Sequence, residues 1–408
     1  MTSYLSISKT SRLSGTIHKL SSSKSISNRA LVLKALSGNQ SVVSNLSDAR
    51  DTQLMSRLVN SPDKIIDVMD AGTTMRFLTA YFALTGKNKI LTGTARMKER
   101  PIGILVDALR TLGATVEYLE KEGFPPIETK GFVNQKTNSL TIPGNVSSQY
   151  ISALMMVAPT LRQGLTLHLT GKMGSVPYIQ MTAALMEQFG VNSKINLDSQ
   201  TIQIDPAQYR PAQIVVEADW SAISYWYGFT ALAEEAEITL PNVSEKSLQG
   251  DRVIADIMEW VGVQSTFVNN TLVLAKKNHF DKIIWDFKDC PDLAQTVLPT
   301  CAAKGISGEF TGLESLRIKE TDRIVALQNE LAKIGATLTE PQTGNWILTP
   351  GKITGQPITI NTYHDHRMAM GFAPWATQTD LTIEDPSVIN KSYPGFWEDM
   401  KTVGFEIR

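Results

Sequence analysis

The sequence predicts an α/β protein of two domains, in which six repeated helix–strand units surround buried helices. Three observations carry this prediction. The chain has 408 residues, more than one hydrophobic core usually organises. Apolar, alanine-rich helices recur along nearly its whole length, and a second series of helices ends each time in a glycine. Six units divided between two domains give three units per domain.

The first helix of each unit is strongly apolar. Each of these segments opens with small or polar capping residues, continues as an apolar run of helical length, and leads into a short strand. Typical strands are expected at residues 165–169, 237–240 and 381–383. The six helical segments lie at residues 23–38, 72–86, 147–164, 221–236, 291–305 and 365–379.

Equivalent positions near these helix starts recur with a nearly constant period. Successive members are 71 to 75 residues apart in the series Thr73, Ser148, Ser221, Asp292 and Asp365. Ser25 precedes Thr73 by only 48 residues, so we expect a shortened first unit. A period of this length is too long for a solenoid or a TIM barrel.

The second helix of each unit is amphipathic and ends in a glycine before a strand, as expected of a helix C-cap. The first helices look apolar on every side, so we expect them to pack together inside, with the strands outside. If their N-terminal ends share a cleft, the helix dipoles favour an anionic ligand there. The five glycines are Gly113, Gly190, Gly262, Gly335 and Gly404.

Composition excludes several classes of protein. The 39 lysine and arginine residues balance 40 aspartate and glutamate residues, so no global field draws the chain to nucleic acid or to a membrane surface. Two cysteines, Cys290 and Cys301, supply neither a disulfide framework nor a structural zinc site. The start of the chain lacks a signal-peptide pattern, and no apolar run reaches about 18 residues. We therefore expect a cytoplasmic protein.

Basic side chains gather at the expected helix starts. Pro101 fits the first position of a helix, directly after two of these arginines. Helix dipoles would instead place stabilising cations in the last turn, so this pattern favours local binding of anions. The residues are Lys24, Arg29, Arg76, Arg96, Arg100, Lys319, Arg323, Arg367 and Lys391.

Each candidate also has a plain structural interpretation. The stretch LRIKETDRI, residues 316–324, is typical of a solvated helix face, with an ordinary ion pair between Glu320 and Arg323. Asp292 is most simply the N-cap of the helix that follows it. Cys290 has no histidine nearby in the sequence, so burial is the default for its thiol.

The histidines do not indicate a metal site. His364 and His366 are two positions apart, and no further matched cluster accompanies them. A structural or catalytic metal requires three or four such ligands. We therefore expect no metal.

Seven motifs lie in order along the chain: SKSISNRAL, DAGTTMRFL, RMKERPIG, SSQYISALMM, RIKETDRI, DHRMAM and KSYPGFW. Through these motifs, the chain resembles the 5-enolpyruvylshikimate-3-phosphate synthase family from about residue 10 to its C-terminus. It implies an inside-out α/β barrel of two domains that close on the substrates, each domain having three repeated units around buried parallel helices. The expected domains are residues 1–21 with 219–408, and an inserted domain, residues 22–218.

The resemblance implies an enzyme of the shikimate pathway. The expected reaction transfers the enolpyruvyl (1-carboxyvinyl) group of phosphoenolpyruvate to the 5-hydroxyl of shikimate 3-phosphate, by addition and elimination. It implies two small-molecule substrates, no metal or organic cofactor, and a monomer. Lysines and arginines would neutralise the phosphates and carboxylates of the substrates.

Site residues follow from the resemblance by position. Glu320 is expected to protonate the methylene carbon, and Asp292, with Lys24, to act on the hydroxyl group. The positions expected around shikimate 3-phosphate are Lys24, Ser25, Arg29, Ser147, Ser148, Gln149, Ser175, Tyr178, Asp292, Ser315 and Lys319. Those expected around phosphoenolpyruvate are Lys24, Gly72, Arg100, Gln149, Arg323, Arg367 and Lys391.

Five positions depart from the family pattern. Asp70 stands where asparagine is frequent and adds a carboxylate near the cations expected to bind phosphoenolpyruvate. Ser315 replaces a ligand-binding asparagine, and Val176 stands where lysine often occurs. Ser22 and Trp220 alter the two crossovers between domains. None of these changes removes a catalytic group, so they bear on affinity.

Other functions fit the motifs less well. The enolpyruvyl transferase that acts on UDP-N-acetylglucosamine usually carries a loop cysteine, which ARMKERPIG lacks. A P-loop kinase would need a glycine-rich pattern that SSSKS does not have. A non-catalytic anion-binding protein would be expected to have lost Asp292 or Glu320, and both are present.

Overall fold

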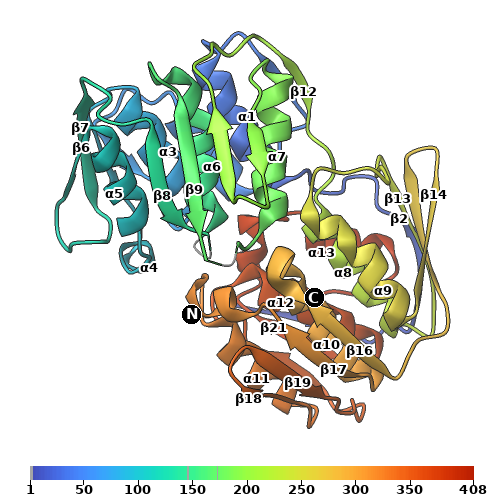
Figure 1. Cartoon of the computed structure of the whole chain (residues 1–408). Helices are drawn as coiled ribbons and strands as arrows, with labels where there is room; N and C mark the ends of the chain where they lie inside the picture. The colour runs from blue at the N-terminus through green and yellow to red at the C-terminus, as the bar shows by residue number, and fades with distance from the viewer. Residues whose placement is uncertain (1–2, 145–146, 172) are drawn as a thin grey trace. The chain divides into compact units, whose positions relative to one another are not determined.

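The computed structural model describes residues 3–144, 147–171 and 173–408. The chain forms two compact units (Figure 1). Unit 1 comprises Met1–Ser23 and Glu217–Arg408, and unit 2 comprises Lys24–Val216. Each unit has a hydrophobic core of its own.

Unit 2 contains three sheets and the helices that pack against them. Its helices are α1 (Lys24–Leu36), α2 (Arg50–Leu58), α3 (Gly72–Leu84), α4 (Ala95–Lys98), α5 (Gly103–Leu112), α6 (Ser148–Val157) and α7 (Val176–Gln188). Its strands are β3 (Val42–Ser44), β4 (Ile65–Asp67), β5 (Lys89–Thr92), β6 (Ala114–Tyr118), β7 (Ile127–Phe132), β8 (Ser139–Pro143), β9 (Leu165–Thr170), β10 (Lys194–Asn196), β11 (Thr201–Ile204) and β12 (Gln213–Val215).

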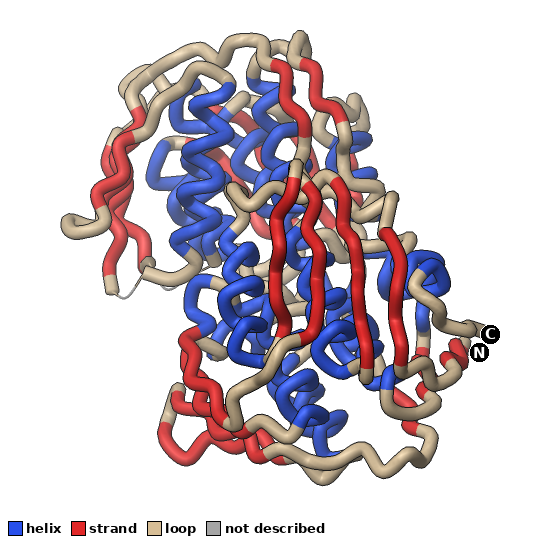
Figure 2. The backbone as a smooth tube through the Cα atoms, turned by 90° about the vertical axis from the view of Figure 1, so that its right-hand side faces the viewer, coloured by secondary structure: helices blue, strands red, loops and turns tan. Residues whose placement is uncertain are grey.

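Unit 1 also contains three sheets, and Figure 2 shows the long strands of one of them in front of its helices. Its helices are α8 (Trp220–Leu232), α9 (Ile254–Val261), α10 (Ala294–Lys304), α11 (Arg323–Ala332), α12 (His366–Phe372) and α13 (Phe396–Thr402). Its strands are β1 (Tyr4–Ile7), β2 (Arg12–Thr16), β13 (Glu235–Pro241), β14 (Val263–Val268), β15 (Thr271–Lys276), β16 (Lys282–Asp286), β17 (Ser307–Thr311), β18 (Thr337–Gln342), β19 (Asn345–Thr349), β20 (Ile358–Ile360) and β21 (Leu381–Glu384).

Four of the six repeats are complete and share one topology. In a complete repeat, the strand before the first helix pairs in parallel with the strand after it, and two antiparallel strands follow the second helix. The sheet β16-β17-β19-β18 is an example, and β4-β5-β7-β6, β8-β9-β11-β10 and β2-β13-β15-β14 have the same order. The predicted repeat is confirmed.

The first and last repeats are incomplete, and their sheets differ from the other four and from each other. The first repeat has no antiparallel strand pair after α2, so its sheet consists only of β12 and β3. The last repeat ends the chain, and the N-terminal strand β1 pairs antiparallel with β21 to extend its sheet. The prediction of a shortened first unit is confirmed.

The first helices are buried on nearly every side, as predicted. Every residue of α12 is buried, and in α3, α6 and α8 the residues that escape burial are Thr73, Gln149 and Ser221. Each of these is the second residue of its helix. The N-terminal ends of these helices are therefore the places where the buried layer can reach a ligand.

The predicted C-caps are confirmed, whereas one predicted helix start is wrong. Gly113, Gly190, Gly262, Gly335 and Gly404 all have positive φ angles after their helices. Pro101 does not begin a helix, because α5 starts at Gly103 with Ile102 as its N-cap. The carbonyl of Pro101 accepts hydrogen bonds from Arg76 and Tyr150, which hold this residue in the loop.

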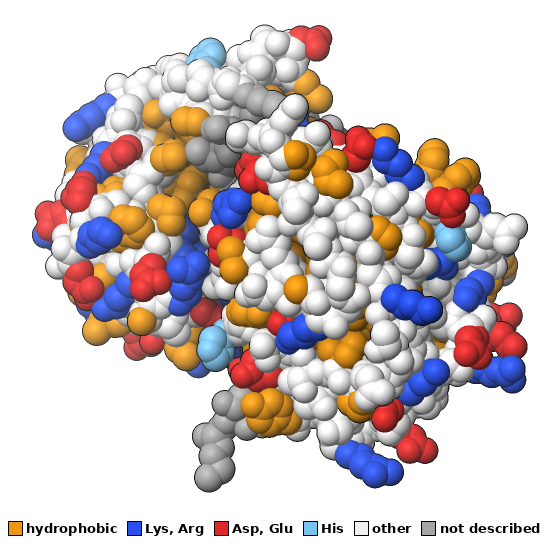
Figure 3. Space-filling view, turned by 90° about the horizontal axis from the view of Figure 1, so that it is seen from below, with side chains coloured by type: hydrophobic (Ala, Val, Ile, Leu, Met, Phe, Trp, Pro, Cys, Tyr) orange, Lys and Arg blue, Asp and Glu red, His pale blue; other side chains and the backbone are white. Residues whose placement is uncertain are grey.

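Charge is spread over the surface. In Figure 3, basic and acidic side chains alternate over the visible face, in keeping with the near-zero net charge. Among the described residues, no helix combines the length and the hydropathy needed to cross a bilayer.

Substituting two helix-capping glycines should separate backbone strain from a steric clash. Gly262 has φ +97°, and a Cβ there would lie 2.9 Å from the carbonyl oxygen of Lys277; Gly305 has φ +84° with nothing within 4 Å. Gly305→Ala should cost about 1 kcal/mol for the left-handed conformation, and Gly262→Ala about 1–3 kcal/mol more because of the clash.

Tryptophan fluorescence during urea unfolding can measure this difference, because all 7 tryptophans lie in unit 1. Equal shifts of the unfolding midpoint for the two variants would show that the contact at Lys277 relaxes without cost.

Candidate active site

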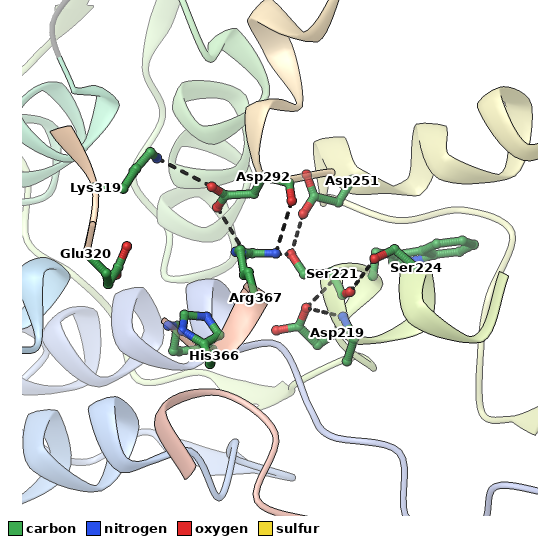
Figure 4. Close-up of polar contacts among 12 residues, drawn as sticks. Asp219, Ser221, Ser224, Asp251, Asp292, Lys319, Glu320, His366 and Arg367 are labelled. Carbon is green, nitrogen blue, oxygen red and sulfur yellow. Dashed lines mark hydrogen bonds and ion pairs between the residues drawn. The ribbon is translucent and has the colours of Figure 1, made fainter. Parts of the chain in front are cut away.

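In unit 1, three buried helices begin at the same place. Arg367, the second residue of α12, donates hydrogen bonds to Ser221 Oγ at 3.2 Å and to Asp292 Oδ2 at 3.0 Å (Figure 4). Ser221 lies at the start of α8, and Asp292 lies in the 3₁₀ turn η4 (Pro291–Leu293) directly before α10. The side chains at three helix starts therefore form one polar cluster.

A buried arginine joins the carboxylates of this cluster. Arg323, the first residue of α11, is 2% exposed. Its guanidinium donates to Asp365 at 2.7 Å and 3.3 Å, to Asp292 at 3.0 Å and to Glu320 at 2.9 Å. Although burial opposes it, the attraction of these carboxylates raises the pKa of Arg323 above its usual value. The residue is permanently charged.

Asp292 is an ionised member of the cluster and caps no helix. Burial disfavours its charge, but Arg367, Lys319 and Arg323 together hold the pKa of its carboxyl well below the usual range. Lys319 Nζ lies 3.5 Å away. The N-cap residue of α10 is Leu293, which makes no side-chain cap bond. The N-cap interpretation was wrong because Lys319 and Arg323, beside the second helix of the same repeat, and Arg367 of the next repeat draw the carboxylate away from the helix.

Glu320 lies between two cations. Its Oε2 atom accepts from Arg323, and its Oε1 atom is 3.3 Å from Nζ of Lys391. Lys391 is 3% exposed, at the end of the 3₁₀ turn η7 (Pro386–Lys391). A carboxylate and an ammonium that are both shielded from water interact more strongly than a surface pair.

The stretch 316–324 is thus more than a solvated helix face. Its residues Lys319, Glu320 and Arg323 belong to the cluster, although the pair between Glu320 and Arg323 is also the expected i, i+3 pair. Asp322 and Arg317 are partly exposed and lie 3.6 Å apart. Asp322 is also the N-cap of α11, accepting from the two backbone amides that follow Arg323.

In unit 2, two helix starts also meet. Gln149 of α6 donates to Thr73 of α3 at 3.0 Å, and Ser147 caps α6 by accepting from the amide of Gln149. Lys24, the first residue of α1, lies 3.3 Å from the buried Asp51 of α2. Unit 2 therefore repeats the arrangement of unit 1, with fewer carboxylates.

Arg29 is a buried cation that no carboxylate neutralises among the residues that the structure describes. Its guanidinium donates to Thr182, to the carbonyl of Ser25 and to Ser152, and it lies against the ring of Tyr178 at 5.7 Å. Burial lowers its pKa to about 10. A buried charge without a counter-charge is costly, so an anion bound here would be stabilised.

Arg100 is positioned by a glycine. A Cβ on Gly72 would lie 2.6 Å from the NH1 atom of Arg100, so the guanidinium occupies the space beside the start of α3 that a side chain would fill. Its buried Nε has no hydrogen-bond partner among the described atoms. Asp70, expected near these cations, forms an ion pair at 2.8 Å with Arg50.

The remaining residues predicted from the sequence lie outside the charged clusters described above. Ser175 has φ +56° directly before α7, whose first residue is Val176. Ser148 is buried at the start of α6, whereas Ser315 is exposed on the 3₁₀ turn η5 (Glu314–Ile318). Among the described residues, no hydrogen bond joins Ser315 to the cluster of unit 1. Trp220 is buried against Phe267, and Ser22 bridges to Ala218.

Sequence reasoning missed three carboxylates of these clusters. The sequence analysis used Asp365 only to measure the repeat period, yet its fully buried side chain binds Arg323. Asp51 and Asp251 each lie where the second helix of a repeat begins, which is the only sequence signal that they share. The expected burial of Cys290 is confirmed, and this burial raises the pKa of its thiol to about 12.

Comparisons with known proteins agree over nearly the whole chain. The family model for EPSP synthase (3-phosphoshikimate 1-carboxyvinyltransferase) matches residues 7–61 and 56–400. A 3-phosphoshikimate 1-carboxyvinyltransferase of Bacteroides fragilis is 46% identical over 407 residues and covers 98% of both chains. One of Vibrio cholerae is 37% identical over 416 residues, covering 95% of this chain and 96% of its own.

A solved structure shares the fold. The EPSP synthase of Acinetobacter baumannii superposes with a TM-score of 0.77 over 100% of both chains at 18% identity. The two-domain inside-out barrel is therefore the fold of this chain.

Replacing Arg323 by leucine should strongly destabilise unit 1. The change leaves Asp292, Glu320 and Asp365 without their shared cation, and breaking a buried pair costs about 3–5 kcal/mol. The loss should shrink between pH 7 and pH 4, because carboxylates freed from the arginine can take up protons.

Urea unfolding followed by tryptophan fluorescence measures this loss. Arg317→Leu is the matched control in the same stretch, and loss of its exposed pairs should cost about 1 kcal/mol or less. A loss in Arg323→Leu no larger than in this control would contradict the importance of the arginine.

Proposed function

Because the chain belongs to the EPSP synthase (3-phosphoshikimate 1-carboxyvinyltransferase) family, we propose that it transfers the 1-carboxyvinyl group of phosphoenolpyruvate to the 5-hydroxyl of shikimate 3-phosphate. The products are 5-enolpyruvylshikimate 3-phosphate and phosphate. The observation that carries this proposal is the cluster of unit 1, in which Asp292 and Glu320 lie among Lys319, Arg323, Arg367 and Lys391.

The cations suit a substrate with a phosphate and a carboxylate. Arg367 and Lys391 form charge-assisted bonds with the catalytic carboxylates, and a bound phosphoenolpyruvate competes for the same donors. Unit 2 contributes Arg100, whose guanidinium has no carboxylate partner among the described residues, together with Lys24, Gly72 and Gln149. We assign these residues to phosphoenolpyruvate.

The residues around Arg29 suit shikimate 3-phosphate. The uncompensated charge of Arg29 attracts its phosphate. On the resemblance, the hydroxyl groups of Ser25, Ser147, Ser148, Ser175 and Tyr178 hold its polar groups. The resemblance adds Lys319 and Asp292 to this set. Ser315 is kept in the proposal on the resemblance alone.

The chemistry needs one acid and one base. Asp292, with Lys24, accepts the proton of the 5-hydroxyl as its oxygen bonds to the second carbon of phosphoenolpyruvate, and Glu320 protonates the methylene carbon. Loss of phosphate from the second carbon, and of a proton from the carbon that Glu320 protonated, then restores the double bond. When substrate anions engage Arg367, Arg323 and Lys391, both carboxylates lose attraction to those cations and bind protons more readily.

The resemblance also supports three finer points of the proposal. The enzyme would be a cytoplasmic monomer, with the catalytic carboxylates in the discontinuous domain 1–21 with 219–408, and most of the shikimate 3-phosphate site in the domain 22–218. Size-exclusion chromatography with light scattering tests the monomer.

Phosphate release from phosphoenolpyruvate tests the activity. The wild type should release phosphate only with shikimate 3-phosphate, and UDP-N-acetylglucosamine should not replace it. Glu320→Gln and Asp292→Asn should each lower kcat by about 10²–10⁴-fold through loss of proton transfer.

Glu314→Gln, a change of the same charge at an exposed position of η5, is the control that should keep wild-type activity. A folded wild type that releases no phosphate with either acceptor would refute the proposed reaction.

Gly72→Ala should weaken phosphoenolpyruvate binding selectively. The new Cβ displaces the guanidinium of Arg100, and losing one hydrogen bond to a charged group costs about 1.5–3 kcal/mol. The KM for phosphoenolpyruvate should therefore rise roughly tenfold to a hundredfold, with little change in the KM for shikimate 3-phosphate.

Steady-state kinetics with each substrate varied measures this selectivity. Gly103→Ala is the control, since its Cβ would meet neighbours only at 3.5 Å or more. Similar rises in both KM values would argue against the assignment of Arg100.

A further inference from the structure

A second buried carboxylate, that of Asp251, is linked to Arg367 through a hydroxyl group. Asp251 lies in the 3₁₀ turn η2 (Gly250–Val253) before α9 and is 4% exposed. Its Oδ2 atom is hydrogen-bonded to Ser221 Oγ, which in turn accepts from Arg367 (Figure 4). Arg367 also binds Asp292. One relay thus runs from Asp251 through Ser221 and Arg367 to a proposed catalytic carboxylate.

Of the two carboxylates in this relay, Asp251 interacts more weakly with cations than Asp292 does. Its Oδ1 atom is buried without a hydrogen-bond partner, and no ion pair involves Asp251 among the described residues. Burial, and then the charge of Asp292, raise the pKa of Asp251 to about 6, against the pull of Arg367. Asp292, by contrast, contacts three cations directly.

The pseudo-equivalent residue in unit 2 shows what differs. Asp51 is the second residue of α2, the second helix of the first repeat, and Asp251 lies in the turn before α9, that of the fourth. Each contacts a residue at the start of the first helix of its repeat. Asp51 contacts the ammonium group of Lys24, whereas Asp251 contacts the hydroxyl group of Ser221. Only the carboxylate in unit 1 therefore reaches its cation through an intermediate.

The unit 1 cluster contains as many carboxylates as cations. Lys319, Arg323, Arg367 and Lys391 are opposed by Asp251, Asp292, Glu320 and Asp365. With every group ionised, these charges cancel and the cluster has no net charge. Protonation of Asp251 leaves one cation in excess.

On the basis of the proposed function, we propose that Asp251 is a positioning residue that orients Arg367 through Ser221 and takes up a proton when phosphoenolpyruvate binds. An anion beside Arg367 adds negative charge near Asp251 and so favours its protonated form, and by linkage the protonated form binds the anion more tightly. The step moves one proton from solvent to a carboxylate oxygen.

Other charged groups face Asp251 as well. Asp219 caps α8 and adds negative charge, as does Asp292 before α10; Arg367 on α12 opposes them. Beside Asp251, Arg252 directs its guanidinium to Asp256 and Glu245. His366 lies next to Arg367 and 3.5 Å from Asp365, so its titration must be separated from that of Asp251 by a variant.

Calorimetric titration with phosphoenolpyruvate alone, in buffers of different ionisation enthalpy between pH 6 and 8, measures the proton uptake without turnover. The wild type should take up more protons than Asp251→Asn, which mimics the protonated form. If binding raises the pKa of Asp251 by one unit, affinity changes by about tenfold between the protonated and ionised enzyme. The KM of the wild type for phosphoenolpyruvate should rise correspondingly with pH, and that of Asp251→Asn should rise less.

Two further variants keep the test decisive. Asp256→Asn, an exposed change on α9 of equal charge, should behave as the wild type. Ser221→Ala should raise the KM for phosphoenolpyruvate with little change in kcat, and this result is expected even if Asp251→Asn fails to fold.

The outcomes separate this inference from the proposed reaction. Turnover with equal proton uptake in the wild type and Asp251→Asn, or a Ser221→Ala variant with an unchanged KM, would overturn the role of Asp251 alone. Absence of both phosphoenolpyruvate binding and phosphate release in the wild type would overturn the proposed function and, with it, this inference.

Discussion

The buried guanidinium of Arg323 is the interaction on which the candidate site of unit 1 depends. It binds Asp292, Glu320 and Asp365, which come from the starts of helices in two repeats. Three carboxylates brought this close would repel one another strongly in a medium that excludes water. One permanently charged donor with several N–H groups in fixed directions turns that repulsion into a rigid framework.

The repeat explains why such a framework can form. The first helices α3, α6 and α8 are buried along their length except at the second residue of each, so their N-terminal ends are the parts left accessible. The backbone amides at these ends favour anions, so an anion-binding site arises wherever several of them meet. Side chains then adapt the two units differently: carboxylates balance the cations of unit 1, whereas Arg29 and Arg100 in unit 2 have no carboxylate partner among the described residues.

Local interpretation of the sequence failed where distant partners decide the geometry. The N-cap assigned to Asp292 and the helix start assigned to Pro101 both follow good local rules. Lys319, Arg323 and Arg367 draw Asp292 away from its helix, and Arg76 and Tyr150 hold the carbonyl of Pro101 in a loop. No local window contains these partners.

The sequence by itself determined the six repeats, their buried first helices, the glycine C-caps and the short first unit, because periodic burial and positive φ angles leave direct marks in residue type. It also determined the family, through motifs that lie in order along the chain. Only the tertiary structure decided which charges meet. Asp365 reaches Arg323 across 42 positions, and Asp251 acts on Arg367 through Ser221. Pairing between distant side chains depends on how the repeats pack, and the spacing of residues along the chain does not record it.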